Sequence, residues 1–270
     1  MIDTYFYIPA DRVKFINKIP EINATSFILD FEDSIQFSKL DLALENISQI
    51  QNLNNFWARP IIFDNKNNLD LSLIKKIINL GVTKFVLPKI SKKKHLKAIS
   101  KLESIDKCKV ILLIESAEAL NNIDKLLTFK KINIEGVALG SHDFVNDLEM
   151  KYTLENLKYF RQKILIKAKT YGIQPIDIAS MDIKNKEAFK LEALTGFNMG
   201  YRSKMILHPS QIDFLDEVLF FNQEEIMFAR KVIQKYPNLN HEIEALNFEG
   251  IILEKPHVNR ILEIIKTDLI

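Results

Sequence analysis

The sequence predicts an α/β fold, a (β/α)8 TIM barrel followed by a C-terminal helical extension. Short apolar runs rich in β-branched and aromatic residues alternate strictly with amphipathic stretches. The runs are nearly continuous in apolar character, which is typical of parallel strands that helices cover on both faces. Eight such units within roughly 220 residues fit the size of a (β/α)8 barrel. An open doubly wound sheet is the alternative, but that fold usually has a Gly-rich first turn or fewer units.

Eight apolar runs are the expected strands, and amphipathic stretches with the apolar period of a helix lie between them. The strands are TYFYI (4–8), SFILD (26–30), FWARPIIF (56–63), KFVLP (84–88), KVILLI (109–114), GVAL (136–139), PIDI (175–178) and SKMIL (203–207). The clearest helical stretches are 39–50, 69–81 and 152–172. The last of these ends on Gly172, a residue type that favours helix ends. We expect a barrel domain over 1–220 and an extension over 221–270 that packs on a neighbouring subunit.

Composition narrows the class of protein. The 270 residues are 47% hydrophobic and carry a formal net charge of +2. That balance argues against nucleic acid or an anionic membrane as the main partner. No apolar run approaches the roughly 18 residues of a membrane span, and the first residues lack the basic, apolar pattern of a secretory signal. We therefore expect a cytoplasmic enzyme or binding protein.

Several common catalytic signatures are absent from the sequence. None of its seven glycines forms a nucleotide-binding G-x-G-x-x-G or P-loop, and no G-x-S-x-G elbow occurs. The single cysteine, Cys108, excludes an internal disulfide and a Cys-rich zinc site, and the histidines lack zinc-binding spacing. We expect Cys108 to be a buried structural thiol.

Charged and polar residues follow the expected strands, where the active sites of such barrels lie. They are Asp30, Glu32, Asp33, Arg59, Lys89, Glu115, Ser141, Asp143, Asp177 and His208. A structural role is the alternative for each one alone. Asp33 and Asp143 fit helix caps, and His208 fits a hydrogen bond across the rim as well as it fits a functional role. The convergence of so many charges on one rim favours a functional site.

Glu115 and Asp143 are the strongest candidates. Each lies just past an apolar run, and they are 143 − 115 = 28 residues apart, about one strand–helix–strand step. In a parallel barrel that spacing places both carboxylates on the same rim, in neighbouring positions. Mg²⁺ usually takes one or two protein carboxylates and leaves its other positions to water and substrate. The pair is therefore a candidate Mg²⁺ site.

Arg59 is the only arginine inside an expected strand. A guanidinium there must face a carboxylate or the active-site opening, because burying it unpaired is costly. Its fork geometry suits a substrate carboxylate. Glu32 and Asp33 are expected to orient Arg59 or to hold metal-bound waters, and Lys89 to do either job or to pair with a nearby acid.

In this order, the strand-end residues resemble the citrate lyase β-subunit-like branch of the HpcH/HpaI aldolase superfamily. The likeness covers nearly the whole chain, and its pieces are specific in combination. They are FYIPADRVKFINK (6–18), FILDFEDSI (27–35), WAR (57–59), VLPKI (86–90), LLIESAEAL (112–120), GVALGSHDFVNDL (136–148), PIDI (175–178) and KMILHPSQI (204–212).

The resemblance implies a Mg²⁺-dependent enzyme that makes or breaks a C–C bond in a small 3-hydroxy-acyl-CoA, such as citryl-, malyl- or citramalyl-CoA. It implies Mg²⁺ on Glu115 and Asp143, and a 2-oxo acid on Arg59 and Lys89. Supporting catalytic roles fall to Glu32 and Asp33. It also implies a homotrimer or a hexamer. The C-terminal segment GIILEKPH (250–257) resembles one that often reaches a neighbouring subunit's site, which makes Glu254 a catalytic candidate.

The chain departs from the family pattern at several places. Pro9-Ala10 stands for the usual Pro-Gly, His142 for the acid common before the metal-binding Asp, and Glu254 for an Asp. The residues expected to bind the metal and the substrate carboxylate thus follow the family pattern, whereas those expected near the thioester depart from it. The alternatives are a CoA-independent aldolase or thioesterase on the same metal site, or a non-catalytic relative that binds a 2-oxo acid.

Overall fold

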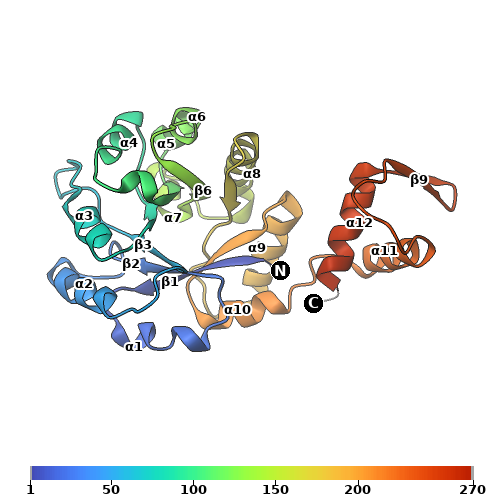
Figure 1. Cartoon of the computed structure of the whole chain (residues 1–270), viewed down its shortest axis with the longest axis horizontal. Helices are drawn as coiled ribbons and strands as arrows, with labels where there is room; N and C mark the ends of the chain where they lie inside the picture. The colour runs from blue at the N-terminus through green and yellow to red at the C-terminus, as the bar shows by residue number, and fades with distance from the viewer. Residues whose placement is uncertain (1, 269–270) are drawn as a thin grey trace. The chain divides into compact units, whose positions relative to one another are not determined.

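The computed structural model describes residues 2–268, and the chain divides into two compact units. The first unit is Ile2–Val218, and the second begins at Leu219. Figure 1 shows the strands of the first unit gathered at its centre, with helices around them. The strands are β1 (Asp3–Pro9), β2 (Ser26–Asp30), β3 (Phe56–Arg59), β4 (Lys84–Leu87), β5 (Lys109–Ile114), β6 (Asn133–Leu139), β7 (Gln174–Ile176) and β8 (Ser203–Ile206).

The eight strands form one parallel barrel, as the sequence predicted. Their hydrogen-bonded order is β7-β6-β5-β4-β3-β2-β1-β8. A parallel bridge between Asp177 and Lys204 joins the two ends of this order. There the Asp177 amide donates to Ser203 O at 2.9 Å, and the Met205 amide donates to Asp177 O at 3.1 Å. These bonds close the sheet and leave no open edge between β7 and β8.

Helices follow the strands and cover the barrel. They are α1 (Val13–Ile16), α2 (Leu40–Ser48), α3 (Ser72–Asn79), α4 (Lys93–Ile99), α5 (Ala117–Asn121), α6 (Ile123–Leu127), α7 (Ser141–Asp147), α8 (Leu154–Thr170), α9 (Lys186–Met199) and α10 (Pro209–Asp216), with 3-10 turns at Ile19–Glu21, Phe37–Lys39 and Ile105–Lys107. The three helices predicted most clearly are α2, α3 and α8. Gly172 follows α8 with φ +68°, the left-handed conformation expected at a helix end.

Two details differ from the prediction. The third strand ends at Arg59 instead of residue 63, because Pro60 has no N–H to continue the ladder. Two crossovers contain two helices each, α5 with α6 and α7 with α8, so the strict one-helix alternation is wrong there. The extra helix α7 begins directly after β6, and it carries Asp143 in its first turn.

Side chains of one phase on each strand fill the barrel interior. They are Tyr5, Ile28, Trp57, Val86, Ile111, Leu113, Ala138, Ile176 and Met205. Because side chains alternate along a strand, the residue two positions after each of these points the same way. That rule carries the inward phase from Ile28 to Asp30, from Trp57 to Arg59 and from Leu113 to Glu115. The strand phase therefore aims these three charged side chains at the mouth of the barrel.

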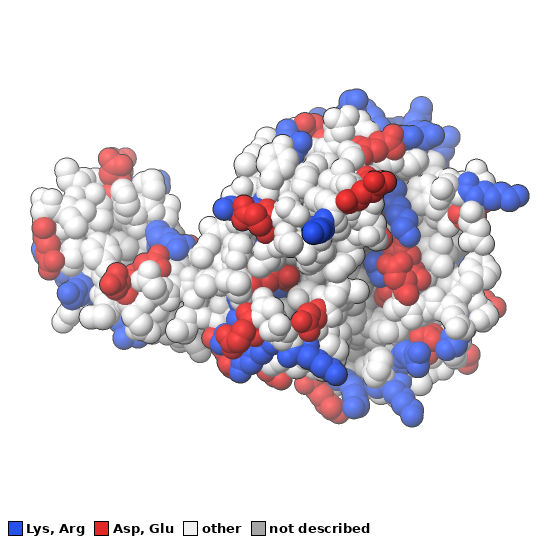
Figure 2. All heavy atoms as spheres, turned by 180° about the vertical axis from the view of Figure 1, so that it is seen from behind, with Lys and Arg blue, Asp and Glu red and all other residues white. Residues whose placement is uncertain are grey.

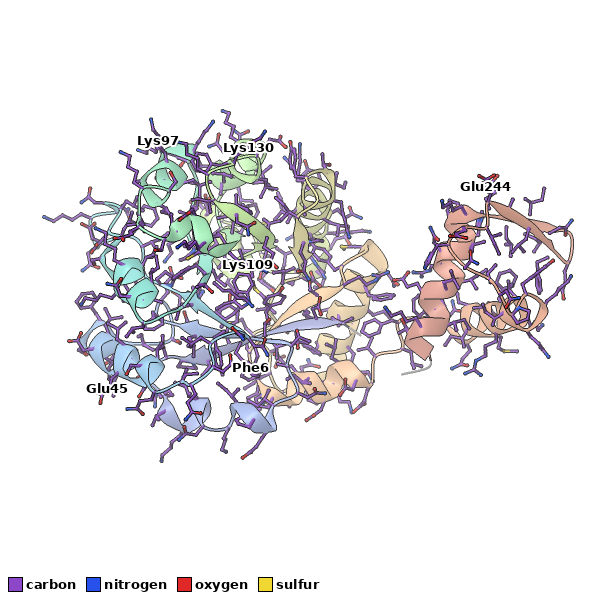
Figure 3. All side chains as sticks on the ribbon, in the orientation of Figure 1. Phe6, Glu45, Lys97, Lys109, Lys130 and Glu244 are labelled. Atoms are coloured by element: carbon purple, nitrogen blue, oxygen red, sulfur yellow. The ribbon has the colours of Figure 1, made fainter. Side chains whose placement is uncertain are left out.

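The outer surface of the barrel unit is charged and mixed in sign. Figure 3 shows Glu45 on α2 and Lys97 on α4 extending away from the barrel, and both are exposed. Figure 2 shows acidic and basic side chains interspersed over one face of the molecule. The lysine run at residues 92–94 and 97 is accordingly a solvated helix start. Within residues 2–268, no helix combines the length and apolar character needed to cross a bilayer.

The second unit contains α11 (Gln223–Lys235), a hairpin of β9 (Ala245–Phe248) and β10 (Ile251–Glu254), and α12 (Lys255–Asp268). Asn222 and Glu225 form a capping box at the start of α11. The two turn residues of the hairpin, Glu249 and Gly250, both have positive φ, which suits a tight hairpin between twisted strands. The extension is thus helical, as predicted, with an added hairpin. Its packing on a neighbouring subunit stays a prediction.

Candidate active site

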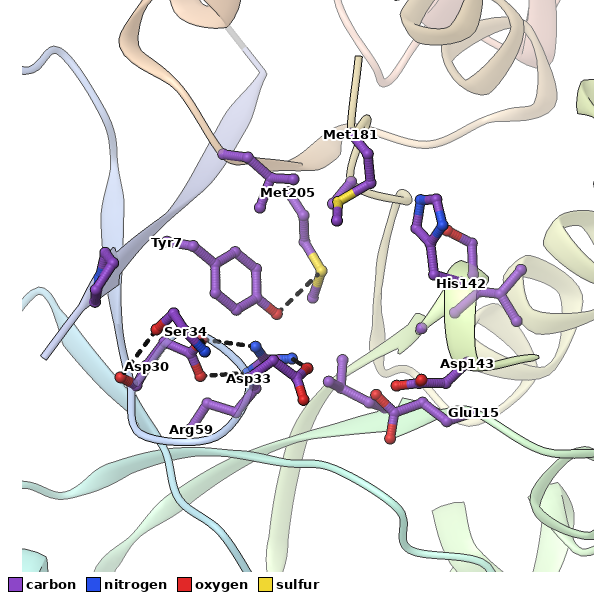
Figure 4. Close-up of a pocket in the computed structure, with 17 residues that line it drawn as sticks. Tyr7, Asp30, Asp33, Ser34, Arg59, Glu115, His142, Asp143, Met181 and Met205 are labelled. Atoms are coloured by element: carbon purple, nitrogen blue, oxygen red, sulfur yellow. Dashed lines mark hydrogen bonds and ion pairs between the residues drawn. The ribbon is translucent and has the colours of Figure 1, made fainter. Parts of the chain in front are cut away.

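A cavity of about 340 Å³ opens at the carboxyl ends of the barrel strands, and we call it the strand-end pocket. Its lining comes from β1, β2, β3, β5, β6 and β8 and from the segments that follow the strands. Among the predicted site residues it includes Asp33, Arg59, Glu115 and Asp143. Figure 4 shows that these residues converge from separate strands and loops. These four predicted residues therefore share one pocket.

Asp30 holds the guanidinium of Arg59 in a bidentate ion pair. Arg59 Nε donates to Asp30 Oδ1 and Arg59 Nη2 donates to Asp30 Oδ2, each at 2.7 Å. The two residues are register partners on β2 and β3. Asp30 also accepts the backbone N–H groups of Glu32 at 3.1 Å and Ser34 at 3.2 Å. The main orienting group for Arg59 is thus Asp30, which the sequence analysis placed on the rim without assigning it this role.

The remaining edge of the Arg59 guanidinium faces Asp33 and Glu32. Arg59 Nη1 lies 3.1 Å from Asp33 Oδ2 and 3.5 Å from Glu32 Oε2. The Asp33 side chain is 56% exposed, whereas that of Glu32 is 7% exposed. The ring of Tyr7 lies 5.0 Å from Arg59 Cζ and packs against the guanidinium. Asp33 is therefore the most exposed of the three acids that contact the Arg59 guanidinium.

Glu115 is a buried carboxylate with few partners. It is 6% exposed, and its Oε2 accepts the backbone N–H of Lys89 at 2.6 Å. Burial raises the pKa of Glu115 to about 8, the charges of Glu32 and Asp143 add to this shift, and the Lys89 N–H opposes it. A cation bound between these carboxylates would relieve the repulsion and the burial cost. The electrostatics of the pocket thus favour a metal ion at Glu115.

Lys89 contacts the acids of the site through both its backbone N–H and its side-chain ammonium. Its φ is +56°, in the left-handed region that a non-glycine residue rarely adopts, and this conformation accompanies the short N–H bond to Glu115. Its ammonium lies 2.6 Å from Glu32 Oε1. Because Lys89 does not line the strand-end pocket, the structure favours pairing with an acid over direct substrate contact.

The absence of a side chain at Gly140 leaves the space that the Glu115 side chain occupies. A Cβ at position 140 would lie 2.3 Å from Glu115 Cγ and 2.6 Å from Oε1. Gly140 is also the N-cap of α7, so the chain turns there and carries Asp143 in the first helical turn. Figure 4 shows the Asp143 and Glu115 carboxylates next to each other on one side of the pocket. The predicted neighbouring carboxylates are therefore brought together.

Asp177 is a strand-end residue that does not face the pocket. It lies one position after the inward-facing Ile176, so its side chain points toward the helices. There Arg161 Nε and Nη2 donate to its two carboxylate oxygens at 3.0 and 2.7 Å, and both residues are buried. The pair sits at the β7–β8 seam, where Lys204 Nζ also donates to Glu192 Oε1 at 2.7 Å. Asp177 thus has a structural role, and placing it in the rim was wrong.

His208 has a structural role as well. It is the N-cap of α10 and forms a capping box with Gln211. Its Nδ1 lies 2.8 Å from Ser210 Oγ, and the residue is exposed. Of the two open interpretations, the structure supports the structural one.

The sequence analysis missed several pocket residues. Tyr7 lies two positions after the inward Tyr5, and the strand phase could have found it. His142 could not be found this way, because it follows β6 on a helix. Its ring stacks on Tyr152 with centroids 4.3 Å apart and planes 12° apart, and burial lowers the pKa of His142. Glu254 ends β10 in the second unit, and its catalytic role stays a prediction.

This arrangement can be compared with known proteins. The sequence profile of the HpcH/HpaI aldolase/citrate lyase family matches residues 3–209, which include the barrel and every predicted site residue except Glu254. The chain belongs to the HpcH/HpaI aldolase/citrate lyase family. This assignment confirms the resemblance, and with lyases among the relatives it makes the protein a carbon–carbon lyase by class.

Named relatives of this family member span almost its whole length. The mitochondrial citramalyl-CoA lyase of Homo sapiens is 25% identical over 280 residues, which cover 93% of this chain and 80% of the relative. The (3S)-malyl-CoA thioesterase of Cereibacter sphaeroides is 20% identical and covers 93% of this chain and 89% of the relative. CitE of Mycobacterium tuberculosis, crystallised with magnesium, acetoacetate and coenzyme A, superimposes with a TM-score of 0.78 at 20% identity and 97% coverage of both chains. This likeness confirms the fold.

The residues of this family member fit a magnesium ion. Glu115 and Asp143 offer hard oxygen ligands, and Glu115 is buried with a raised pKa, as expected for a carboxylate that lacks a counter-charge. In residues 2–268, no group of three or more His, Cys, Asp or Glu side chains is arranged to hold a metal. Two carboxylates with open positions suit Mg²⁺, which keeps several waters and meets its substrate directly.

Proposed function

We propose that this protein is a Mg²⁺-dependent lyase that cleaves or forms a C–C bond in a small 3-hydroxy-acyl-CoA, giving a 2-oxo acid and an acyl-CoA. The observation that carries the proposal is the joint placement of Arg59 and the Glu115–Asp143 pair in one pocket. One carbon of such a substrate bears both a carboxylate and a hydroxyl oxygen. Binding both groups at once needs a guanidinium and a hard metal ion side by side. The CoA-bound structural neighbour supports the thioester as carrier.

In this proposal Arg59 binds the substrate carboxylate. Asp30 fixes the guanidinium through Nε and Nη2, so the Nη1 side remains for the ligand. The exposed Asp33 leaves this side when the ligand arrives, and Tyr7 keeps the guanidinium plane in place from one face. Because the Arg59 guanidinium is already oriented, it binds the substrate carboxylate without a further loss of side-chain entropy.

Glu115 and Asp143 would hold Mg²⁺, which supplies positive charge next to the oxygen that becomes the carbonyl. In the cleavage direction the hydroxyl proton leaves to a base and the C–O bond becomes a carbonyl. The C–C electron pair passes to the carbon next to the thioester, and that carbon then takes up one proton. Glu32 does not line the pocket, so its proposed catalytic role is a supporting one, in which it holds the guanidinium of Arg59 and the ammonium of Lys89 in place. Glu254 is our candidate for the thioester end.

The proposal is tested by incubating the full chain with citryl-, malyl- and citramalyl-CoA, with and without Mg²⁺. We expect a 2-oxo acid to appear from at least one of them only when Mg²⁺ is present. Arg59→Lys keeps the charge but loses the fork, and it should raise KM more than it lowers kcat. Absence of Mg²⁺-dependent cleavage from all three thioesters would overturn the proposal.

A thioesterase is the second candidate, because one relative with high coverage has that activity. Hydrolysis releases free CoA thiol and a hydroxy acid, whereas the lyase reaction releases a 2-oxo acid and keeps the thioester. Measuring thiol and 2-oxo acid in the same samples separates the two. Thiol release without 2-oxo acid would favour the thioesterase, and a 2-oxo acid formed from a CoA-free hydroxy-oxo acid would favour the CoA-independent aldolase.

A further inference from the structure

Tyr7 brings a phenol hydroxyl into the strand-end pocket. It follows the inward-facing Tyr5 by two positions on β1, so its side chain points toward the mouth of the barrel, and it lines the pocket. Figure 4 shows its ring extending into the pocket, with the hydroxyl end toward the side where Glu115 and Asp143 lie. In the proposed function only the ring has a role, because it packs on the Arg59 guanidinium, and the hydroxyl is unused.

This hydroxyl has a weak hydrogen-bond acceptor. It donates to the thioether sulfur of Met205 at 3.5 Å, and it makes no other hydrogen bond with the described part of the chain. By contrast, two buried tyrosines donate to oxygen, Tyr5 to Gln174 Oε1 at 3.2 Å and Tyr201 to a backbone carbonyl at 2.7 Å. Since a thioether is a poor acceptor, the Tyr7 hydroxyl gains free energy when it exchanges the sulfur for an oxygen that a ligand brings.

The Tyr7 side chain lies beside the cation that would hold the ligand. Arg59 Cζ is 5.0 Å from the centre of the Tyr7 ring, and both residues line the same cavity of about 340 Å³. A small anion on Arg59 therefore has the Tyr7 side chain as its neighbour. Burial raises the pKa of Tyr7, an effect that Arg59 opposes and that Asp30 and Glu115 reinforce. The group thus stays a neutral hydroxyl near neutral pH, so it can donate a hydrogen bond and carries no charge that would repel the anion.

We propose that the Tyr7 hydroxyl is a second binding group of this pocket, which leaves Met205 and donates a hydrogen bond to an oxygen of the 2-oxo acid on Arg59. The inference rests on the proposed function, because that function places the carboxylate of the acid on Arg59. No covalent bond breaks and no proton is transferred, since the hydroxyl hydrogen only changes its acceptor from sulfur to an anionic oxygen. Hydrogen bonds to an ionised acceptor are roughly twice as strong as neutral ones, and this difference favours the exchange.

Tyr7→Phe removes only the hydroxyl and keeps the ring on Arg59. Because a hydrogen bond to a charged group is lost, we expect the affinity of the Mg²⁺-loaded chain for pyruvate to fall by roughly 10-fold or more. The midpoint of urea unfolding should stay close to that of the natural chain, since the ligand-free protein loses only a bond to sulfur. A purely structural hydroxyl predicts the reverse, a lower midpoint with unchanged affinity.

Tyr5→Phe is the matched control, because it removes a hydroxyl from the same strand outside the pocket. It breaks the bond to Gln174, so it should lower the urea midpoint and leave the pyruvate affinity within about twofold.

Met205→Leu tests whether Tyr7 acts through the sulfur instead. The change nearly keeps the volume and the apolar character of the side chain. Direct donation to the ligand predicts that Tyr7→Phe lowers the affinity by a similar factor in the natural chain and in the Met205→Leu background. If the hydroxyl acted only by holding Met205, Tyr7→Phe would have no further effect in that background.

The experiment measures binding of pyruvate, glyoxylate and oxaloacetate to the full chain by titration calorimetry at fixed free Mg²⁺, alongside cleavage of the three thioesters. A loss of roughly 10-fold or more in Tyr7→Phe that is absent from Tyr5→Phe and persists in the Met205→Leu background supports the inference. Equal affinities of Tyr7→Phe and the natural chain overturn it, as do equal losses in Tyr7→Phe and Tyr5→Phe, or binding of none of the three acids. Cleavage decides the lyase proposal separately. A natural chain that cleaves no thioester but binds an acid through Tyr7 keeps the inference and loses the lyase function, whereas a lyase whose acid affinity ignores Tyr7→Phe does the opposite.

Discussion

The backbone N–H of Lys89 donates to Glu115 Oε2 at 2.6 Å, from a residue held at φ +56°. A left-handed non-glycine residue costs of order 1–2 kcal/mol, so the surrounding structure must stabilise this conformation. The same residue sends its ammonium to Glu32, which lies 2.6 Å away. One residue thus links the candidate metal ligand to the acid that contacts Arg59, through its backbone on one side and its side chain on the other.

Replacing Lys89 by glycine separates these two contributions. Lys89→Gly keeps the N–H and adopts positive φ readily, so we expect the Mg²⁺ affinity to stay within about threefold of the natural chain. Glu32 loses its 2.6 Å ion pair with Lys89 and keeps only the 3.5 Å ion pair with Arg59, so kcat should fall. Lys89→Ala keeps neither the ammonium nor an easy positive φ, and it should weaken Mg²⁺ binding as well. Titration calorimetry with Mg²⁺ checks both variants, and equal loss of affinity in the two would show that the ammonium matters more than the backbone.

Removing the carboxylate of Glu115 should remove the metal site. We expect Glu115→Ala to abolish Mg²⁺-dependent binding of a 2-oxo acid while the circular dichroism spectrum stays that of the natural chain. Glu115→Gln keeps the shape and the acceptor for the Lys89 N–H, and it should also fail to bind Mg²⁺, because the charge is lost. Glu118→Ala, a change at an exposed carboxylate three residues away, is the control. Unchanged Mg²⁺ affinity in both Glu115 variants would refute the ligand assignment.

Gly140→Ala tests the space that Glu115 needs. The φ of Gly140 is −76°, which alanine adopts freely, so the expected effect comes only from the Cβ placed 2.3 Å from Glu115 Cγ. We expect a loss of Mg²⁺ affinity of roughly tenfold or more, since a displacement of about 1 Å at a ligand is costly. Gly172→Ala is the matched control, with strain at φ +68° but no atom within 4 Å of the new Cβ. It should lower the free energy of unfolding by about 1 kcal/mol and leave Mg²⁺ binding unchanged.

The stability of the metal-free protein should fall as the pH rises toward 8. Because the pKa of Glu115 is raised to about 8 in the folded chain, the folded state holds a proton that the unfolded state releases near pH 4.5. The stabilisation is complete below about pH 4.5 and is lost as the pH rises through about 8. Mg²⁺ replaces that proton, so the rise in melting temperature on adding Mg²⁺ should be larger at pH 8 than at pH 6. Glu115→Gln should make this Mg²⁺-induced rise small at both pH values.

Asp30 should matter more for stability than Asp33. Asp30→Asn leaves the buried Arg59 guanidinium without its main counter-charge, and we expect a loss of about 3–5 kcal/mol in the free energy of unfolding. Asp33→Asn removes a largely exposed partner and should cost less than about 1 kcal/mol. Urea unfolding of the two variants checks the difference. Equal losses would indicate that Asp33 shares the orienting role.

The sequence by itself determined the strand–helix pattern of the barrel and the main charged residues of its rim. Apolar runs that alternate with helical stretches indicate a parallel sheet covered by helices, and eight such units in roughly 220 residues favour a closed barrel over an open sheet. Glu115 and Asp143 were found from spacing alone, since one strand–helix–strand step returns the chain to the same rim. Arg59 was found because a charge inside a strand needs a partner or an opening.

Only the tertiary structure decided which rim residues share the pocket. Strand phase sends Asp30 inward and Asp177 outward, although both were expected at the ends of strands, and that phase depends on how the barrel closes. His208 became a helix cap because α10 starts there, and Lys89 met Glu115 through its backbone because its φ is positive. Such choices depend on which neighbouring strand or helix supplies a partner within about 3 Å, and the sequence order of the residues does not contain that distance.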